Sequence, residues 1–348
     1  MTKSGGKVRL AIIGAGLISG RHAPAIRAHR DKIDCVAACD ISEENLRQLS
    51  EKLGGGQKLF GDWKVMLREF GGQIDAVDIC LPHHLHAPAI LDAAAAGKHI
   101  LCEKPMCINM KEADEIVAAL RRSKLTYMSA HNELFMPVVR EMKRLIDDGA
   151  VGPIRWLRVT HCRLTPQTVF RGKWRSNVKL QGGGVLIDTG YHSSYKLLHL
   201  AGSEPVNIRA TMGRYHVELE GEDTASVHIQ FANGAIGEIL VSWGMSFPHG
   251  NHQLHVIGEK GQIYGSDQEV YLLTDGTREP LKHVLPPVET FEAEMEHFAD
   301  CLLNGTRPIH SWEEGYAVLN LILKATEHAK GWETYAQKKW GASDGGLK

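Results

Sequence analysis

Short apolar runs alternate with amphipathic segments between residues 8 and 130. Six of these runs have the length and composition of buried β-strands: 8–13, 35–39, 58–60, 75–81, the middle of 97–105, and 126–130. The segments between them place apolar residues three and four positions apart, as expected for helices that bury one face. Six alternations of strand and helix predict an α/β domain with a doubly wound parallel sheet, which we assign to residues 1–134.

The pattern changes in the second half of the chain. After a helix that begins at Pro137 and ends at Gly149, seven β-type runs follow: 156–160, 206–212, 225–231, 235–243, 253–257, 262–264 and 270–274. Asn233-Gly234 and Asp275-Gly276 are typical of hairpin turns, so at least part of this second sheet is antiparallel. Residues 135–348 are predicted to form an α+β domain, whose carboxyl-terminal helix could pack back on the first domain.

Composition places the chain among ordinary globular proteins. Of its 348 residues, 43% are hydrophobic and 23% are charged, and the formal net charge is -1. Because there is no basic excess, neither nucleic acid nor an anionic membrane is an expected partner. The apolar runs have only strand length, and residues 1–7 lack the apolar core of a signal peptide, so a cytoplasmic enzyme is the expectation.

A glycine-rich turn follows the first predicted strand directly, with the sequence Gly14-Ala15-Gly16-Leu17-Ile18-Ser19-Gly20. A turn of this type between a strand and a helix is the context that a dinucleotide-binding Rossmann fingerprint requires. Gly14 allows the tight turn, Gly16 lets the backbone approach a pyrophosphate, and the amino terminus of the following helix offers N–H donors. Leu17 and Ile18 of the turn are also expected to contact the cofactor. Ser19 stands where a third Gly or Ala is usual, and it is still small enough for close packing.

An acidic residue ends the second predicted strand. Asp40 lies 26 residues after Gly14, near the offset of the acid that accepts hydrogen bonds from the adenosine ribose hydroxyls. Such an acid favours NAD over NADP, because it repels the 2′-phosphate of NADP. The alternative is that Asp40 only begins a turn, since Ser42 can cap the next helix.

Charged and polar residues also follow the next strands. Glu103-Lys104 stands at the carboxyl end of the fifth predicted strand, where open parallel sheets bind ligands. The alternative is a solvated ion pair at a strand end. His83, His84 and His86 follow Pro82 closely, but no Cys or carboxylate with ligand spacing accompanies them, so no metal is expected there.

The second half contains one further polar motif, Gly182-Gly183-Gly184-Val185-Leu186-Ile187-Asp188-Thr189-Gly190-Tyr191-His192. A helix beginning near Val185 would place Asp188 and His192 on one face, four residues apart. The acid could then orient the imidazole or raise its pKa. The alternative is an Asp–His pair on a helix surface beside a glycine-rich loop.

Three segments together resemble the glucose–fructose oxidoreductase/inositol dehydrogenase (Gfo/Idh/MocA) family: GAGLISGRH at 14–22, the His86 segment leading to GKHILCEKP at 97–105, and GGGVLIDTGYH at 182–192. The resemblance covers nearly the whole chain. It implies a Rossmann domain followed by an open, largely antiparallel sheet. It also implies an NAD(P)-dependent oxidoreductase of sugars or cyclitols, in which one face of the second sheet commonly forms a homodimer or homotetramer interface.

The same likeness assigns residues to roles. Lys104, Asp188 and His192 match the catalytic positions and are expected to contact the substrate, Lys104 also the cofactor. Trp174 and Arg175 are expected to line the sugar pocket. Five further positions are expected to border the cofactor, with Glu103 beside the nicotinamide ribose: Leu81, Pro82, His83, His86 and Asn132.

Three hypotheses follow from the sequence. The first is a reversible dehydrogenase with His192 as base and Lys104 bonded to the reacting oxygen. The second is a glycosidase-like enzyme that retains NAD and cleaves a glycosidic bond after transient oxidation. The third is a non-enzymatic sugar or dinucleotide sensor, against which the presence of Lys104, Asp188 and His192 argues. The substrate, the reacting carbon and the direction of reaction stay open.

Overall fold

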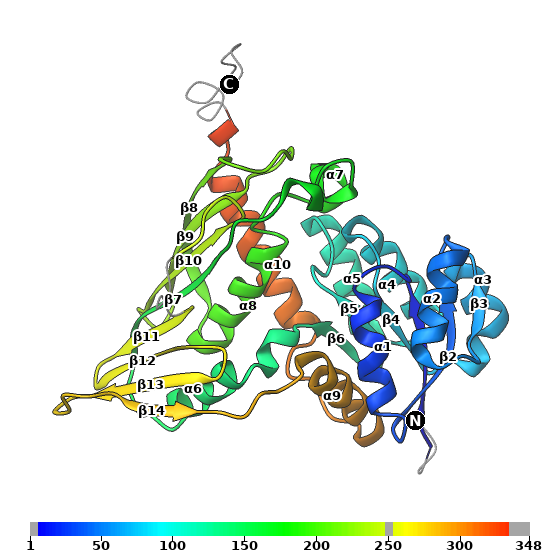
Figure 1. Ribbon diagram of the computed structural model, residues 1–348, viewed down its shortest axis with the longest axis horizontal. Helices are drawn as coiled ribbons and strands as arrows, with labels where there is room; N and C mark the ends of the chain where they lie inside the picture. The colour runs from blue at the N-terminus through cyan, green and yellow to red at the C-terminus, as the bar shows by residue number, and fades with distance from the viewer. Residues whose placement is uncertain (1–5, 248–252, 334–348) are drawn as a thin grey trace. The chain divides into compact units, whose positions relative to one another are not determined.

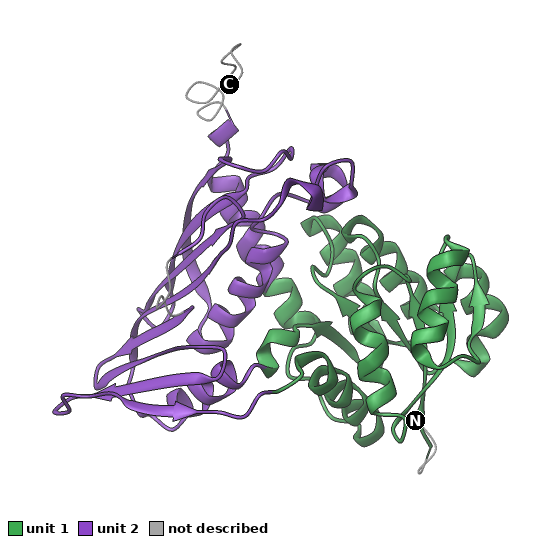
Figure 2. Cartoon of the chain, viewed as in Figure 1, with its two compact units in different colours: residues 1–135, 288–317 green, residues 136–287, 318–348 purple. Residues whose placement is uncertain are grey.

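The computed structural model describes residues 6–247 and 253–333, which fall into two compact units. Unit 1 comprises residues 1–135 and 288–317, and unit 2 comprises residues 136–287 and 318–348 (Figure 2). The chain therefore leaves unit 1 after its sixth strand, builds the sheet of unit 2 and returns to unit 1 for a late segment. In the described residues, the helices are too short or too polar to traverse a lipid bilayer.

Unit 1 contains a six-stranded sheet in the order β3-β2-β1-β4-β5-β6, with every neighbouring pair parallel (Figure 1). The predicted Rossmann sheet is thus confirmed. Its strands are β1 (Val8–Ile13), β2 (Ile33–Cys39), β3 (Lys58–Phe60), β4 (Ala76–Ile79), β5 (His99–Glu103) and β6 (Tyr127–Ala130). Since all strands are parallel, their carboxyl ends share one edge, and the order reverses between β1 and β4, where such sheets bind dinucleotides.

The helices of unit 1 begin where the sequence offers capping residues. Ser42 caps α2 (Glu43–Leu53), Asp62 caps α3 (Trp63–Phe70) and Asn109 caps α5 (Met110–Arg122), each by accepting a backbone N–H. The other two helices between the strands are α1 (Ser19–Ala28) and α4 (His86–Ala95). Helix α4 begins at His86, where a short 3₁₀ turn at His83–Leu85 leads directly into it.

A late part of the chain belongs to unit 1. Helix α9 (Thr290–Asn304) packs against α1 and against the 3₁₀ turn Asn132–Phe135. Its inward face buries Glu294, Met295 and Phe298. One acidic side chain therefore enters the interior of unit 1 from α9.

Unit 2 is built on an eight-stranded sheet in the order β14-β13-β12-β11-β7-β10-β9-β8. Only the pair β7 and β10 is parallel, so the predicted open, largely antiparallel sheet is confirmed. The strands are β7 (Ile154–Cys162), β8 (Pro205–Gly213), β9 (Thr224–Phe231), β10 (Ile236–Ser242), β11 (Leu254–Gly258), β12 (Gly261–Ser266), β13 (Glu269–Thr274) and β14 (Leu281–Val284). The sequence pattern missed β14, a short edge strand whose apolar ends Leu281 and Val284 are 61% and 70% exposed.

Helices cover one face of this second sheet. Helix α6 (Pro137–Asp147) packs against β12, β13 and α8 (Thr189–Ala201). Unit 2 also contains the short α7 (Val178–Gln181) and the later part of α10 (Trp312–His328). Helix α8 lies against β7 and β10, and it approaches closely because Gly190 has no side chain: a Cβ there would lie 3.1 Å from Cγ1 of Val241. This close packing fixes the helix that carries His192.

The predicted helix start near Val185 is wrong. Residues 185–188 form a turn, Asp188 has a non-helical ψ of -82°, and α8 begins at Thr189. Glu222 anchors this turn, because Val185 N–H donates to the Glu222 carbonyl (2.8 Å) and Leu186 N–H donates to Glu222 Oε1 (2.9 Å). Gly190 N–H donates to the Val185 carbonyl (2.8 Å), a spacing of five residues instead of the four of an α-helix. Asp188 is therefore the residue before the helix rather than a member of its first turn.

Candidate active site

The glycine-rich turn of unit 1 follows β1 at the switch point of the sheet. Gly14 has a φ of +101°, and a Cβ there would lie 2.5 Å from the carbonyl oxygen of Cys80, so only glycine fits. Around Gly16, by contrast, a Cβ would meet no atom within 4 Å. The turn is thus packed tightly against the end of β4 at Gly14 and is open at Gly16. An open backbone at Gly16 is what the approach of a pyrophosphate requires.

The amino terminus of α1 keeps its N–H donors available for an anion. Ile18 is the N-cap residue and supplies no side-chain cap, and the first turn contains no acidic residue. Ser19 is buried and its hydroxyl donates to the Gly16 carbonyl (2.8 Å), which fixes the turn, while Leu17 is 89% exposed. These features fit a phosphate group at the helix terminus.

Asp40 connects the end of β2 to the glycine-rich turn. Its Oδ2 accepts the Ala15 N–H (2.6 Å) and its Oδ1 accepts the Ser42 N–H (2.8 Å). Asp40 therefore does begin a turn, as the alternative proposed. Because two carboxylate oxygens offer about four acceptor positions, this bonding is compatible with ribose hydroxyls as further donors.

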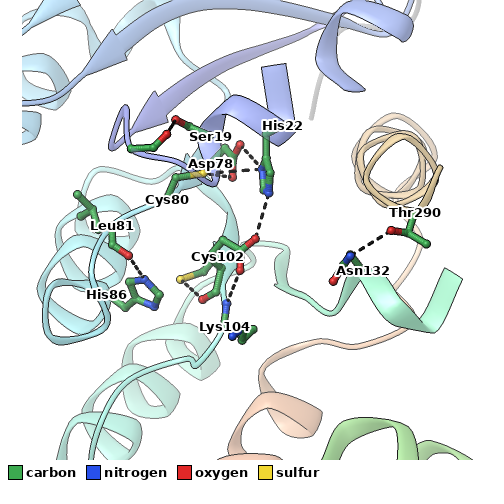
Figure 3. Close-up of polar contacts among 12 residues, drawn as sticks. Ser19, His22, Asp78, Cys80, Leu81, His86, Cys102, Lys104, Asn132 and Thr290 are labelled. Atoms are coloured by element: carbon green, nitrogen blue, oxygen red, sulfur yellow. Dashed lines mark hydrogen bonds and ion pairs between the residues drawn. The ribbon is translucent and has the colours of Figure 1, made fainter. Parts of the chain in front are cut away.

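Leu81, Pro82 and His83 extend the end of β4, and His83 is buried. His86 is fully buried, with Nε2 2.7 Å from the Leu81 carbonyl (Figure 3). Its Nδ1 lies 2.6 Å from the Pro105 carbonyl. Burial lowers the pKa of His86. His86 thus connects the end of β4 to the segment that follows β5.

Glu103 and Lys104 leave the carboxyl end of β5. Glu103 is buried, and its Oε1 lies 3.1 Å from His22 Nε2 while its Oε2 accepts the Lys104 N–H at 3.1 Å (Figure 3). The reading of Glu103 as part of a solvated pair is therefore wrong. Asn132, after β6, donates from Nδ2 to Thr290 Oγ1 (3.1 Å).

One group of possible metal ligands occurs among residues 6–247 and 253–333. His22, Asp78 and Cys80 place ligand atoms within 4.8 Å of one another, all buried. Burial raises the pKa of the Cys80 thiol to about 12, so it stays protonated, and both ring nitrogens of His22 already face carboxyl oxygens. This bonding suits a hydrogen-bonded cluster better than a metal centre.

Unit 2 carries the second polar group. Arg175 donates from Nε to Asp188 Oδ2 (3.1 Å), and its guanidinium lies 4.5 Å from the centre of the Trp174 ring. The structure thus brings together three of the predicted substrate residues. His192, on α8, lies with Nδ1 2.8 Å from the hydroxyl of the buried Tyr195.

Glu222 and Tyr195 are functional candidates that the sequence analysis missed. Glu222 holds the turn before Asp188, and a Cβ on Gly184 would lie 2.0 Å from the Glu222 carbonyl oxygen, which explains the glycine. The sequence signal for Glu222 was the pair of adjacent acids, Glu222-Asp223, directly before a strand. For Tyr195, the spacing of three residues from His192 on one helix was the signal.

Comparison with known proteins identifies the family. The model of the oxidoreductase family with an NAD-binding Rossmann fold matches residues 8–131, and the model of the GFO/IDH/MocA C-terminal domain matches residues 139–264. The chain belongs to the Gfo/Idh/MocA family.

Several similar proteins are named as dehydrogenases of an inositol or a sugar. The chain is 26% identical over 326 residues to the myo-inositol 2-dehydrogenase of Thermotoga maritima, covering 90% of this chain and 94% of the relative. It is 29% identical over 265 residues to the D-xylose 1-dehydrogenase [NADP(+)] of Haloarcula marismortui, covering 73% and 72%. A levoglucosan dehydrogenase solved with NADH and levoglucosan has the same fold, with a TM-score of 0.85 at 23% identity over 94% of this chain and 98% of that one.

The buried Glu222 carboxyl of this Gfo/Idh/MocA protein is expected to make stability depend on pH. Burial raises the pKa of Glu222 to about 7, so the folded chain holds this carboxyl protonated. The protonated carboxyl contributes fully to the free energy of unfolding below a pH of about 4.5, which is the pKa of this group in the unfolded chain. This contribution, at most about 3 kcal/mol, is lost as the pH rises through 7. We expect the melting temperature of Glu222→Gln, relative to the wild type, to rise between about pH 5 and about pH 8 in thermal denaturation. An equal difference at both pH values would contradict this assignment.

Proposed function

We propose that this protein is an NAD-dependent dehydrogenase that interconverts a hydroxyl and a keto group of a sugar, a cyclitol or a sugar derivative. The observation that carries the proposal is the arrangement along one edge of the parallel sheet. The glycine-rich turn after β1, Asp40 after β2 and Lys104 after β5 all stand at the carboxyl ends of strands in the order β2-β1-β4-β5. The names of the inositol and xylose relatives support the substrate class.

The cofactor would be held by residues of unit 1. The first-turn amides of α1 and the open backbone at Gly16 would bind the pyrophosphate, and Asp40 the adenosine ribose. Leu81, Pro82, His83, Glu103 and Asn132 are proposed to line the nicotinamide end. When bound, NAD supplies the acceptor for the hydride removed from the substrate carbon.

Lys104, His192 and Asp188 act on the substrate in this proposal. The Lys104 ammonium donates a hydrogen bond to the reacting oxygen as negative charge develops there. His192 accepts the hydroxyl proton, and Tyr195 orients its ring through Nδ1. Asp188, held by Arg175, and the Arg175–Trp174 pair are proposed to bind substrate hydroxyls.

A substrate panel tests the function. The protein is incubated with NAD and free sugars, cyclitols and sugar acids, and NADH absorbance is followed. We expect net NADH formation with at least one member of the panel, and none after Lys104→Met. A panel without NADH formation, with NAD bound to the protein, would contradict the proposal.

Preference for NAD is the next prediction. The phosphate of NADP would bring a charge of about -1.5 to -2 beside the Asp40 carboxylate, and the neighbouring residue 41 is an exposed isoleucine rather than a cation. We expect NAD to bind at least about tenfold more tightly than NADP, and Asp40→Asn to reduce this ratio while keeping one acceptor oxygen. Calorimetric titration with both dinucleotides measures the ratio. Tighter binding of NADP would overturn the role of Asp40.

We also propose a homodimer or homotetramer. Cross-strand neighbours Ile236, Trp156 and Ile257 form an apolar row over β10, β7 and β11, and the two isoleucines are 50% and 37% exposed. Burial of such a row against a second copy removes apolar surface from water. Sedimentation should therefore give a mass of at least twice 38.5 kDa at micromolar concentration. A monomer would contradict this proposal, and Ile236→Lys should shift an oligomer toward the monomer.

A further inference from the structure

A buried cluster of ionisable side chains lies inside unit 1, behind the segment that carries Lys104. His22 on α1 is 1% exposed, and its ring meets a carboxyl oxygen at each nitrogen: Nδ1 lies 2.8 Å from Asp78 Oδ2, and Nε2 lies 3.1 Å from Glu103 Oε1 (Figure 3). A neutral imidazole donates only one hydrogen bond, whereas an imidazolium donates two. With both carboxyls ionised, this geometry therefore requires a protonated ring.

The groups around His22 agree with a positive charge there. Burial alone would lower the pKa of His22, but the Asp78 carboxylate raises it well above its usual value. Cys80 stays a thiol, with Sγ 3.8 Å from Nδ1. From α9, the Phe291 ring packs against the imidazole with centroids 5.5 Å apart.

Glu294 completes the cluster from α9. It is 1% exposed, and its Oε2 is buried without a hydrogen-bond partner in the described structure. Burial, together with the nearby Glu103 and Asp78, raises the pKa of Glu294 well above the ordinary range, so it is neutral. The positive charge of His22 therefore faces two carboxylates, Asp78 and Glu103, because the third acid, Glu294, is neutral.

The Glu103 side chain connects His22 to the backbone of Lys104. While Oε1 of Glu103 bonds to His22, its Oε2 accepts the backbone N–H of Lys104 at 3.1 Å. On the far side of Lys104, the Pro105 carbonyl is bonded to His86. The backbone at Lys104 is therefore fixed on both sides, and on the Glu103 side the fixing group is a side chain that His22 holds.

We propose that His22 is a positioning residue for Lys104, acting as an imidazolium that bridges Asp78 and Glu103. This inference rests on the proposed function, since Lys104 must act on the substrate for its position to affect turnover. A lysine that is displaced by about 1 Å can lose about 100-fold in rate without any change in cofactor binding. His22 itself touches neither reacting group in this account.

The first test needs no activity. Nitrogen NMR of histidine-labelled protein reports whether each ring nitrogen of His22 carries a proton, with His22→Gln to assign the signal. We expect both nitrogens to stay protonated from about pH 6 to about pH 8, above the unperturbed pKa of about 6.5. A ring that is neutral at about pH 7 would overturn the proposal.

The second test separates positioning from general damage. We expect His22→Gln to lower kcat about 10- to 100-fold while the Kd for NADH changes less than about threefold. His29→Gln, the same change at the residue that caps the carboxyl end of α1, should leave both values unaltered. In a Lys104→Met background, His22→Gln should lower the residual rate by less than about twofold, because the group it positions is gone. An equal loss in both backgrounds would overturn the proposal.

Two outcomes keep this inference distinct from the proposed function. If Lys104→Met retained full turnover, the proposed function would fail, whatever the NMR shows about His22. If His22→Gln did not fold, His22→Gln/Glu103→Gln would replace it, compared with Glu103→Gln alone, because removing one positive and one negative group together leaves the net charge of the cluster unchanged. Equal turnover of these two variants would support the proposal, and a further loss in the double variant would contradict it.

Discussion

Lys104→Met is expected to abolish nearly all turnover and to leave NAD affinity almost unchanged. The ammonium acts on the substrate oxygen in our account, whereas the pyrophosphate is held by the turn at Gly16 and by α1. Loss of one preorganised donor to a developing oxyanion typically lowers kcat by about 10²- to 10³-fold. Methionine keeps much of the length and volume of lysine, so a loss of packing contributes little.

The measurement is steady-state kinetics together with titration of NAD. Lys111→Met, an exposed lysine on α5, is the matched control and should retain full activity. If Lys104→Met instead turned over at a near-normal rate, Lys104 would be a structural residue. If it lost NAD binding as strongly as kcat, its role would be with the cofactor rather than the substrate oxygen.

His192→Ala is expected to remove the acid limb of the pH profile, which is the rise of kcat with pH on the acidic side. Oxidation needs a neutral imidazole to accept the hydroxyl proton, so kcat of the wild type should rise with pH through the histidine pKa, whose unperturbed value is about 6.5. The variant should lose about 10²- to 10⁴-fold in rate and show no such rise. In the reducing direction the same group must be protonated, and the limb should reverse.

Two variants serve as controls for this prediction. His228→Ala removes an exposed histidine of β9 and should leave the profile unaltered. Tyr195→Phe removes the hydroxyl at 2.8 Å from Nδ1, and should lower kcat by less than His192→Ala does while the limb persists. A limb that persists in His192→Ala would assign the proton acceptor to another group.

The parallel sheet of unit 1 was predictable because each strand is a contiguous apolar run with a clear stop. Gly14, Pro82 and Pro105 end strands or follow them closely, and Ser42 and Asn109 cap helices by local bonding. Such features depend on neighbours in sequence, so one sequence suffices to read them. The hairpins of unit 2 were predictable for the same reason.

What sequence could not predict depends on distant partners. The turn before α8 is anchored by Glu222, 36 residues from Leu186, which accepts the N–H groups of Val185 and Leu186. The burial of Glu103 depends on His22, 81 residues away. In both cases a buried carboxyl bonds to a residue of another element, and the local sequence pattern does not indicate which residue that is.

The stoichiometry of NADH to product tests the central claim most directly. With the best substrate of the panel and an excess of NAD, the account predicts one NADH released for each molecule of keto product or lactone formed. The contradicting result is cleavage of a glycoside with only catalytic NAD present and no net NADH, which would replace the dehydrogenase by the enzyme that retains its cofactor.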